Sequence, residues 1–235
     1  MRATAWRKMK EGGLLPLLAG FALVFLLMAL VNMAITWFGE RQGWITYVPL
    51  VDLFDQLELE ITPEQEKAFG AFTVPQMTLA CQAAILVVKT IWEGILAFGC
   101  AVLAIAVLRG GATAFQVLSG FRWPFRTAAL ELLRTLLIAL GTLLFILPGI
   151  YAYYSYRMAF YLLADNPDWS PLRALRESKQ LMRGHRWRLF CLDVSFLGWG
   201  LLVGVTYGIA GIFVTPYYAT ANAAFYEDLL DRTGR

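Results

Sequence analysis

The chain has 235 residues, of which 59% are hydrophobic and only 16% are charged, and its mean hydropathy is +0.58. A soluble domain devotes about a quarter of its residues to charge, whereas here the apolar residues form long uninterrupted blocks. This composition excludes a soluble globular enzyme, a disordered chain and a coiled coil, and it predicts an integral membrane protein. The net charge of +3 is small, and the basic residues flank hydrophobic runs, so we expect no nucleic-acid partner.

Cysteine and histidine give no sign of a metal site or a cofactor. The three cysteines, Cys81, Cys100 and Cys191, are scattered without a CxxC motif, and we interpret them as small core residues. The single histidine, His185, cannot supply a zinc site by itself. We therefore expect neither a metal nor a cofactor.

Six hydrophobic runs are interpreted as membrane spans, since crossing the hydrocarbon core takes roughly 20 apolar residues. The first follows a basic tail and is too long for the core of a cleaved signal peptide. The last uncharged run, 194–226, is too long for one crossing, so we divide it near Tyr207-Gly208. The predicted spans are approximately 14–37, 90–108, 128–147, 150–164, 189–206 and 209–226.

Charge predicts the orientation of these spans. The segment 39–76 is acidic, whereas the N-terminal tail and the segments around 109–126 and 173–188 are basic. Basic segments stay in the cytoplasm, so we expect both termini there and 39–76 outside. A five-span arrangement with the C-terminal tail outside is the alternative. The arms 128–147 and 150–164 then form a short hairpin that turns at Pro148-Gly149.

The external segment 39–76 is predicted to hold one or two amphipathic helices. Apolar residues recur at helical spacing from Val48, and Thr62-Pro63 with Gln65 has the pattern of a capped helix start. These helices are expected to shield the bundle, or else to cover an external site as a lid. The apolar stretch 77–88 either extends the second span beyond the membrane or bends away from it at Lys89 and Glu93.

A basic amphipathic helix is predicted over 170–184, starting at Ser170-Pro171 and ending at Gly184. Such a helix beside a membrane binds anionic headgroups with about 1 kcal/mol per basic residue. Simple anchoring by positive charge is the alternative to a specific lipid or partner site. The lipid-headgroup candidates are Arg173, Arg176, Lys179, Arg183, Arg186 and Arg188.

Four stretches in the second half of the chain have distinctive amino-acid sequences. They are LPGIYAYYSYRMAFYLLADNPD (147–168), ESKQLMRGHRWRLF (177–190), DVSFLGWGLL (193–202) and PYYATANAAFYEDL (216–229). Over 147–229 the chain resembles the bacterial integral membrane proteins grouped as domain of unknown function 975. The resemblance implies a multi-pass fold in the bacterial cytoplasmic membrane, and it implies no catalytic residue.

Arg157 is the strongest functional candidate, because it lies near the middle of the short span 150–164. A charge at the bilayer centre costs at least about 2.5–3.5 kcal/mol, so it needs a partner or a wet cavity. Asp193 and Glu93 are the available intramembrane acids, and a water or Tyr156 is expected to bridge Asp193 to Arg157. The pair is either structural or part of a path for a substrate, a lipid headgroup or a proton.

A polar pocket could form around Arg157. Tyr153 shares its helix face, and Pro216 is predicted to break the last span and free a carbonyl there. The ligand or ion-pair candidates are Arg157, Asp193, Tyr153, Glu93, Lys89, Pro216 and Tyr217, although the tyrosines also suit an aromatic belt at the interface. The small residues Gly200, Gly204 and Gly208 are expected to pack helices within one chain, with dimerisation as the alternative.

The expected function is non-enzymatic. Ser178, His185 and Asp193 match no hydrolase arrangement, and the chain has no P-loop, GxSxG or HExxH motif. We expect an all-α membrane protein that binds or moves a lipid, a peptide or a small amphiphile. The alternatives are a structural, accessory or immunity-type protein whose charges fix packing, and, least favoured, a lipid enzyme. A protein partner or a homo-oligomer stays open.

Overall fold

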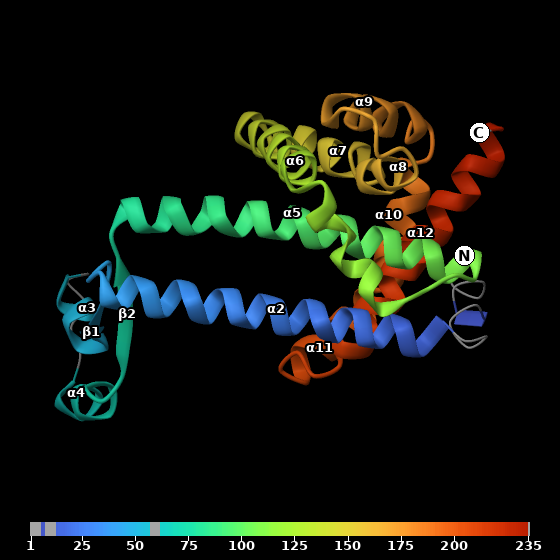
Figure 1. The fold of residues 1–235 in the computed structure, drawn as a ribbon. Coiled ribbons are helices and arrows are strands. Elements are labelled where there is room, and N and C mark those ends of the chain that lie inside the picture. Colours follow the sequence, from blue (N-terminus) through green and yellow to red (C-terminus); the bar gives the residue numbers. More distant parts are fainter. Residues whose placement is uncertain (1–5, 8–12, 57–61, 235) are drawn as a thin grey trace. The chain divides into compact units, whose positions relative to one another are not determined.

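The computed structural model describes residues 6–7, 13–56 and 62–234, and these are predominantly helical (Figure 1). The chain divides into two compact units, which are described separately. The larger unit comprises residues 1–26 and 90–235, and the smaller unit comprises residues 27–89. Glu58 and Glu60 of the acidic segment lie outside the described residues, as do the side chains of Asp55, Glu66 and Cys81.

The smaller unit holds two short helices, α3 (Leu50–Gln56) and α4 (Pro63–Phe69), as predicted for the external segment. Thr62 caps α4: its backbone N–H donates to Gln65 Oε1 (3.0 Å), and its hydroxyl accepts from the Gln65 backbone N–H (3.4 Å). The unit also contains an antiparallel pair, β1 (Ile45–Pro49) and β2 (Thr73–Met77), which was not predicted. Val48, expected in a helix, lies in β1 opposite Val74.

Two helices are longer than a membrane requires. Helix α2 (Leu14–Arg41) has 28 residues and α5 (Leu79–Arg109) has 31, which at 1.5 Å per residue gives about 42 and 46 Å. The hydrocarbon core is about 30 Å thick, so a helix of this length has to tilt or project if it crosses a membrane. Because α5 is unbroken, the stretch 77–88 largely extends the predicted second span, and the chain does not bend at Lys89.

The predicted hairpin is present, but its turn is displaced. Helices α6 (Pro124–Leu144) and α7 (Ile146–Ser155) pack against each other and are joined at Phe145, whose backbone is extended (φ −162°, ψ 154°). The expected turn at Pro148-Gly149 is wrong, because proline fits the first turn of α7. Gly149 instead allows the close packing: a Cβ there would lie 2.1 Å from Thr142 Oγ1.

The rest of the larger unit is a series of shorter helices. A 3₁₀ helix, η2 (Ala114–Arg122), precedes α6, and α8 (Ala159–Asp165) follows α7. The predicted basic helix is α9 (Pro171–Leu181), in which Ser170 accepts the Arg173 backbone N–H (3.3 Å). Gly184 follows it with φ +77°. Helix α10 (Arg186–Ser195) leads into α11 (Leu197–Val205) and α12 (Gly211–Thr233).

The division of the long apolar run 194–226 is confirmed. Tyr207 (φ +50°) and Gly208 (φ +89°) form the left-handed turn that separates α11 from α12. The break expected at Pro216 is wrong, because α12 continues through it. Thr220 adds a hydroxyl hydrogen bond to the Pro216 carbonyl (2.9 Å), within the same helix.

Four helices are long and apolar enough to cross a membrane, judged by length and composition over the described residues. They cover 14–41, 85–109, 124–144 and 186–205, the last being α10 and α11 taken together. The predicted span 150–164 is interrupted between α7 and α8. Most of the predicted span 209–226 lies in α12, which begins at Gly211 and is not one of the four. The all-helical class is thus confirmed apart from the small β-pair, and the count of six spans stays a prediction.

The backbones of α5 and η2 touch in the core of the larger unit. A Cβ on Gly99 would lie 1.8 Å from the Val117 carbonyl oxygen, and one on Gly120 would lie 2.0 Å from the Ile95 carbonyl oxygen. Real Cβ atoms do not approach this closely, so only glycine fits at these two positions.

Candidate functional site

Arg157 lies on an irregular turn rather than within a helix. Residues 156–158 separate α7 from α8, so the short span predicted over 150–164 is discontinuous. The backbone therefore marks the same residue that the sequence singled out by its charge.

The guanidinium of Arg157 binds two tyrosine hydroxyls. It donates to Tyr153 Oη and to Tyr218 Oη, both at 2.8 Å, and its Cζ lies 5.2 and 5.5 Å from the two ring centroids. The expected contact between Tyr153 and Arg157 is thus present. An arginine has five N–H donors, and the two tyrosines take one each, so donors remain for a ligand or water.

Asp193 reaches Arg157 only through Tyr218. The Tyr218 hydroxyl donates to Asp193 Oδ1 at 2.7 Å while it accepts from Arg157. The expected bridge therefore exists, but it is Tyr218 from α12 rather than Tyr156. Among the residues that the structure describes, no carboxylate lies within ion-pair distance of Arg157. We call Arg157, Tyr153, Tyr218 and Asp193 the Arg157 centre.

The other ligand candidates do not make up this centre. Glu93 and Lys89 are exposed on α5, and Pro216 is buried within the unbroken α12. Tyr217 adjoins the centre, since the ring of Phe196 packs against the rings of both Tyr217 and Tyr218.

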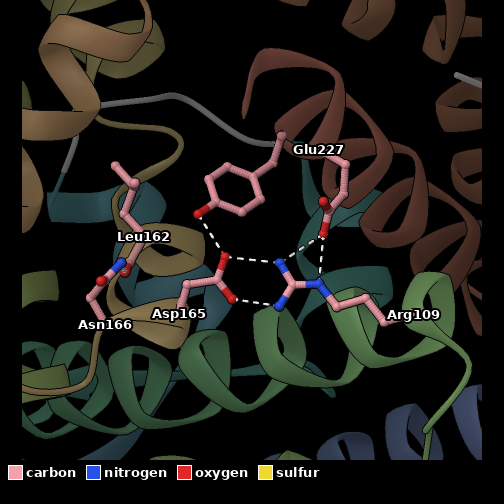
Figure 2. Close-up of polar contacts among 6 residues, drawn as sticks. Arg109, Leu162, Asp165, Asn166 and Glu227 are labelled. Atoms are coloured by element: carbon pink, nitrogen blue, oxygen red, sulfur yellow. Dashed lines mark hydrogen bonds and ion pairs between the residues drawn. The ribbon is translucent and has the colours of Figure 1, made fainter. Parts of the chain in front are cut away.

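A second polar cluster joins the ends of α5 and α8 to α12 (Figure 2). Arg109, at the end of α5, binds Asp165 through two parallel hydrogen bonds (2.8 and 3.0 Å) and Glu227 through Nε (2.9 Å). The Tyr226 hydroxyl also donates to Asp165 (2.9 Å). These contacts join α5, α8 and α12, and every charge has an opposite partner, which is the pattern of a structural clamp.

The model of a family described as protein of unknown function (DUF975) matches residues 50–233, which is most of the chain. The chain belongs to this family. The match begins well before residue 147, so the relationship covers α5, η2 and α6 as well as the stretches that carried the resemblance. No curated protein and no solved structure matches this DUF975 protein.

Two of the six predicted headgroup cations of the DUF975 protein are engaged within the fold. Arg186 donates to Ser155 Oγ (2.9 Å) and stacks over the Tyr151 ring, and Arg188 pairs with Asp228 (2.8 Å). Arg173 lies over the Trp169 ring. The side chains of Arg176, Lys179 and Arg183 are exposed, so these three stay candidates for contact with lipid headgroups.

Asp228 gives a pH-dependent contribution to stability. Burial acts to raise the pKa of its carboxyl, but the hydrogen bonds from Arg188 and Arg232 outweigh it and hold the pKa below its usual value. A carboxyl whose pKa is lower in the folded protein than in the unfolded chain stabilises the fold at pH values above its unfolded pKa of 3.8. This stabilisation is lost as the pH falls through the lower pKa of the folded protein.

At neutral pH we expect the wild type to have a larger free energy of unfolding than Asp228→Asn, and we expect this stability margin to disappear as the pH drops below about 4. The margin at pH 7 should be below about 1 kcal/mol, because the pair is partly exposed. Melting temperatures of both proteins at pH 7 and pH 3 measure it, and a margin that grows in acid would contradict this assignment.

Sequence reasoning did not single out a buried ion pair in the DUF975 chain. Glu131 and Arg134 were noted only as charges in the first turns of a span, yet Glu131 is 5% exposed, and its Oε1 accepts from Arg134 at 2.7 Å and from Thr135 at 3.2 Å. Gly94 of α5 packs directly on Glu131, since a Cβ there would lie 2.6 Å from the Glu131 Cβ. Their i,i+3 spacing within an apolar run is the signal that could have identified the pair.

The glycines of α11, and Gly208 in the turn after it, do not pack as expected. A Cβ added at Gly200, Gly204 or Gly208 would meet no atom within 4 Å among the described residues. Among the described residues these glycines therefore bring no second helix close, and α11 buries none of its residues.

Ser178 and Asp193, two of the three residues compared with a catalytic triad, bind different partners. The buried Ser178 hydroxyl donates to the Ser155 carbonyl (2.8 Å), and Asp193 accepts from Tyr218. In the part of the chain that the structure describes, no three His, Cys, Asp or Glu residues are grouped to hold a metal.

Proposed function

We propose that the protein binds, and in doing so can move, an amphiphile or lipid whose anionic group contacts Arg157. The supporting observation is that Arg157 donates to two neutral hydroxyls and reaches a carboxylate only through Tyr218. A cation with spare donors and without a direct counter-ion attracts an anionic group. In this proposal the protein binds or transports its ligand and catalyses no covalent reaction.

The proposal includes a membrane arrangement. We place the chain in the inner membrane of a bacterium with six spans, both termini in the cytoplasm and the smaller unit outside. The predicted spans 150–164 and 209–226 would be completed by α7 with α8 and by α12. The acidic smaller unit and the basic helix α9 support this orientation by their charge.

Cysteine labelling of intact cells tests the arrangement. In a variant without the natural cysteines, Gly70→Cys is expected to react with a membrane-impermeant maleimide, and Arg176→Cys only after lysis. Both positions are exposed, so access to the reagent is comparable. Labelling of Arg176→Cys in intact cells would overturn the orientation.

Native mass spectrometry of the mildly solubilised protein tests the function. The wild type is expected to retain a specific bound mass that Arg157→Gln lacks, while both give the same monodisperse elution peak. Arg122→Gln is the matched control, because Arg122 is exposed and outside the Arg157 centre. It removes the same charge and should retain the mass.

The alternative function is that of a structural or accessory protein in which the centre fixes packing. It is favoured by the tyrosine relay that joins α7, α10 and α12 through Arg157 and Asp193. In that case no form carries a specific mass, and Arg157→Gln is poorly folded whereas Arg122→Gln is not.

Two exposed cations of α9, Arg176 and Lys179, and Arg183 just after it form a second expected contact, with anionic headgroups on the cytoplasmic side. Arg176, Lys179 and Arg183 together supply about 3 kcal/mol of such attraction at one per residue. Replacing all three with glutamine should weaken binding to anionic vesicles and leave the mass at Arg157 unchanged. Unchanged vesicle binding would contradict this contact.

A further inference from the structure

Charge within the Arg157 centre is balanced through a hydroxyl group. The hydrogen bonds from Arg157 to Tyr218 and from Tyr218 to Asp193 are 2.8 and 2.7 Å long, so Asp193 Oδ1 lies no more than about 5.5 Å from Arg157 Nη2. Opposite charges within about 4–6 Å favour each other's charged forms. The one cation of the centre is therefore matched by one carboxylate, although the two do not touch.

The direction of these hydrogen bonds limits what Tyr218 can offer a ligand. A tyrosine hydroxyl has one proton to donate and lone pairs with which to accept. The Tyr218 hydroxyl donates its proton to Asp193 and accepts from Arg157. It can donate to a ligand at Arg157 only when Asp193 no longer takes that proton. This is the case when Asp193 is itself protonated and donates back to the Tyr218 oxygen.

A bound anion would also disturb the charge balance of the centre. Aromatic rings pack around it: Phe196 lies against the Tyr218 ring, with centroids 5.1 Å apart, and Tyr154 lies against the Tyr153 ring at 5.2 Å. Two anions that share one cation in such surroundings do not both stay ionised. One of them is expected to take up a proton.

Asp193 is the group of the centre that can take up a proton near neutral pH. The titratable and charged side chains around it are Tyr154 of α7, Arg157 of the turn after α7 and Tyr218 of α12, and Tyr153 contacts both Tyr154 and Arg157. The ordinary pKa of arginine is above 12 and that of tyrosine is about 10, so both already hold their protons at pH 7.

We propose that binding of an anionic group at Arg157 is coupled to the uptake of one proton by Asp193. The inference rests on the proposed function and adds a coupling to pH. The proton comes from water and forms an O–H bond on the Asp193 carboxylate, which then donates to Tyr218 Oη. The Tyr218 hydroxyl turns its own proton to the anion while Arg157 keeps its charge. The loaded centre then has the same net charge as the empty one.

Calorimetric titration with 1-decanesulfonate tests the coupling on the full chain in a non-ionic detergent. A sulfonate keeps its charge throughout the pH range used, so any pH dependence comes from the protein. Saturable heat that is absent from Arg157→Gln identifies binding at the centre. Heats in two buffers of different ionisation enthalpy should show close to one proton taken up per bound sulfonate at pH 7. The affinity of the wild type should fall at least about tenfold between pH 6 and pH 8.

A matched pair of variants assigns the proton. Asp193→Asn keeps the side chain neutral, and its amide can donate to the Tyr218 oxygen. Its proton uptake should vanish, and at pH 8 it should bind the sulfonate at least about tenfold more tightly than the wild type. His185→Gln removes the one histidine of the chain, which lies at the start of α10 eight residues before Asp193. This variant should behave as the wild type.

A second matched pair tests the hydroxyl that joins the two charges. Tyr218→Phe keeps the ring and removes the hydroxyl that turns to the anion, so binding at pH 6 should weaken at least about tenfold. Tyr156→Phe removes a hydroxyl from the neighbouring turn and should leave the affinity unchanged.

The outcomes separate the coupling from the proposed function. Binding that depends on Arg157 but gives the same heat in both buffers would overturn the coupling and leave the proposed function standing. Proton uptake that persists in Asp193→Asn, or is lost in His185→Gln, would overturn the assignment to Asp193. Should Asp193→Asn fail to fold, the two-buffer comparison on the wild type still decides. Absence of saturable binding at pH 6 would overturn the inference, while a specific mass lost in Arg157→Gln would still support the proposed function.

Discussion

A Gly99→Ala variant is expected to yield little or no folded protein. The added methyl group would lie 1.8 Å from the Val117 carbonyl oxygen, so the backbone of η2 or of α5 must move. Overpacking a core costs about 1–3 kcal/mol where side chains can yield. Here the obstacle is backbone, so we expect a cost above that range, out of a total stability of about 5–15 kcal/mol.

Gly198→Ala is the matched control for this substitution. Gly198 lies in α11, where an added Cβ meets no atom within 4 Å. The change should leave stability unaltered or raise it by up to about 1 kcal/mol, because alanine favours helix. Yield of the monodisperse peak and melting temperature in detergent measure both variants. If Gly99→Ala melted within two or three degrees of the wild type (about the shift expected for 1 kcal/mol), the contact between α5 and η2 would be wrong.

Arg134→Leu is expected to destabilise the protein by about 3–5 kcal/mol, because it leaves the Glu131 carboxylate buried without its cation. Glu131 Oε2 already lacks a partner among the described residues, so the carboxylate would keep only the Thr135 hydroxyl. A decrease of this size should appear as a large fall in the melting temperature.

Replacing both Glu131 and Arg134 tests whether the loss of stability comes from an unpaired buried charge. The double variant Glu131→Leu with Arg134→Leu should recover most of the loss, since apolar side chains of similar volume often match or exceed a buried ion pair in stability. Arg122→Leu, at an exposed position, is the control for loss of one arginine. A double variant that is less stable than Arg134→Leu alone would show that the carboxylate has a role beyond this pair.

Features encoded by neighbouring residues could be predicted from the sequence. The cap at Thr62, the start of α9 at Ser170-Pro171 and the turn at Tyr207-Gly208 each depend on residues a few positions apart. The hydrophobic runs likewise gave the long helices α2 and α5, because the length of an apolar run limits what it can form.

Features that depend on distant residues could not be predicted in the same way. Tyr218 bridges Arg157 and Asp193 from 61 and 25 residues away, and nothing local distinguishes it from Tyr156. The turn at Phe145 was missed for another reason. Pro148 suits either a turn or the first turn of a helix, and only the packing of Gly149 against Thr142 decides between them.

The clamp in Figure 2 also sets an order for assembly during synthesis. Arg109 and Arg188 are synthesised well before α12, which carries their partners Glu227 and Asp228. Until the ribosome has made residue 228, Arg188 lacks that carboxylate, and Arg109 has only Asp165. The cations on α5 and α10 therefore have all their carboxylate partners only after α12 has been made and has packed against these helices.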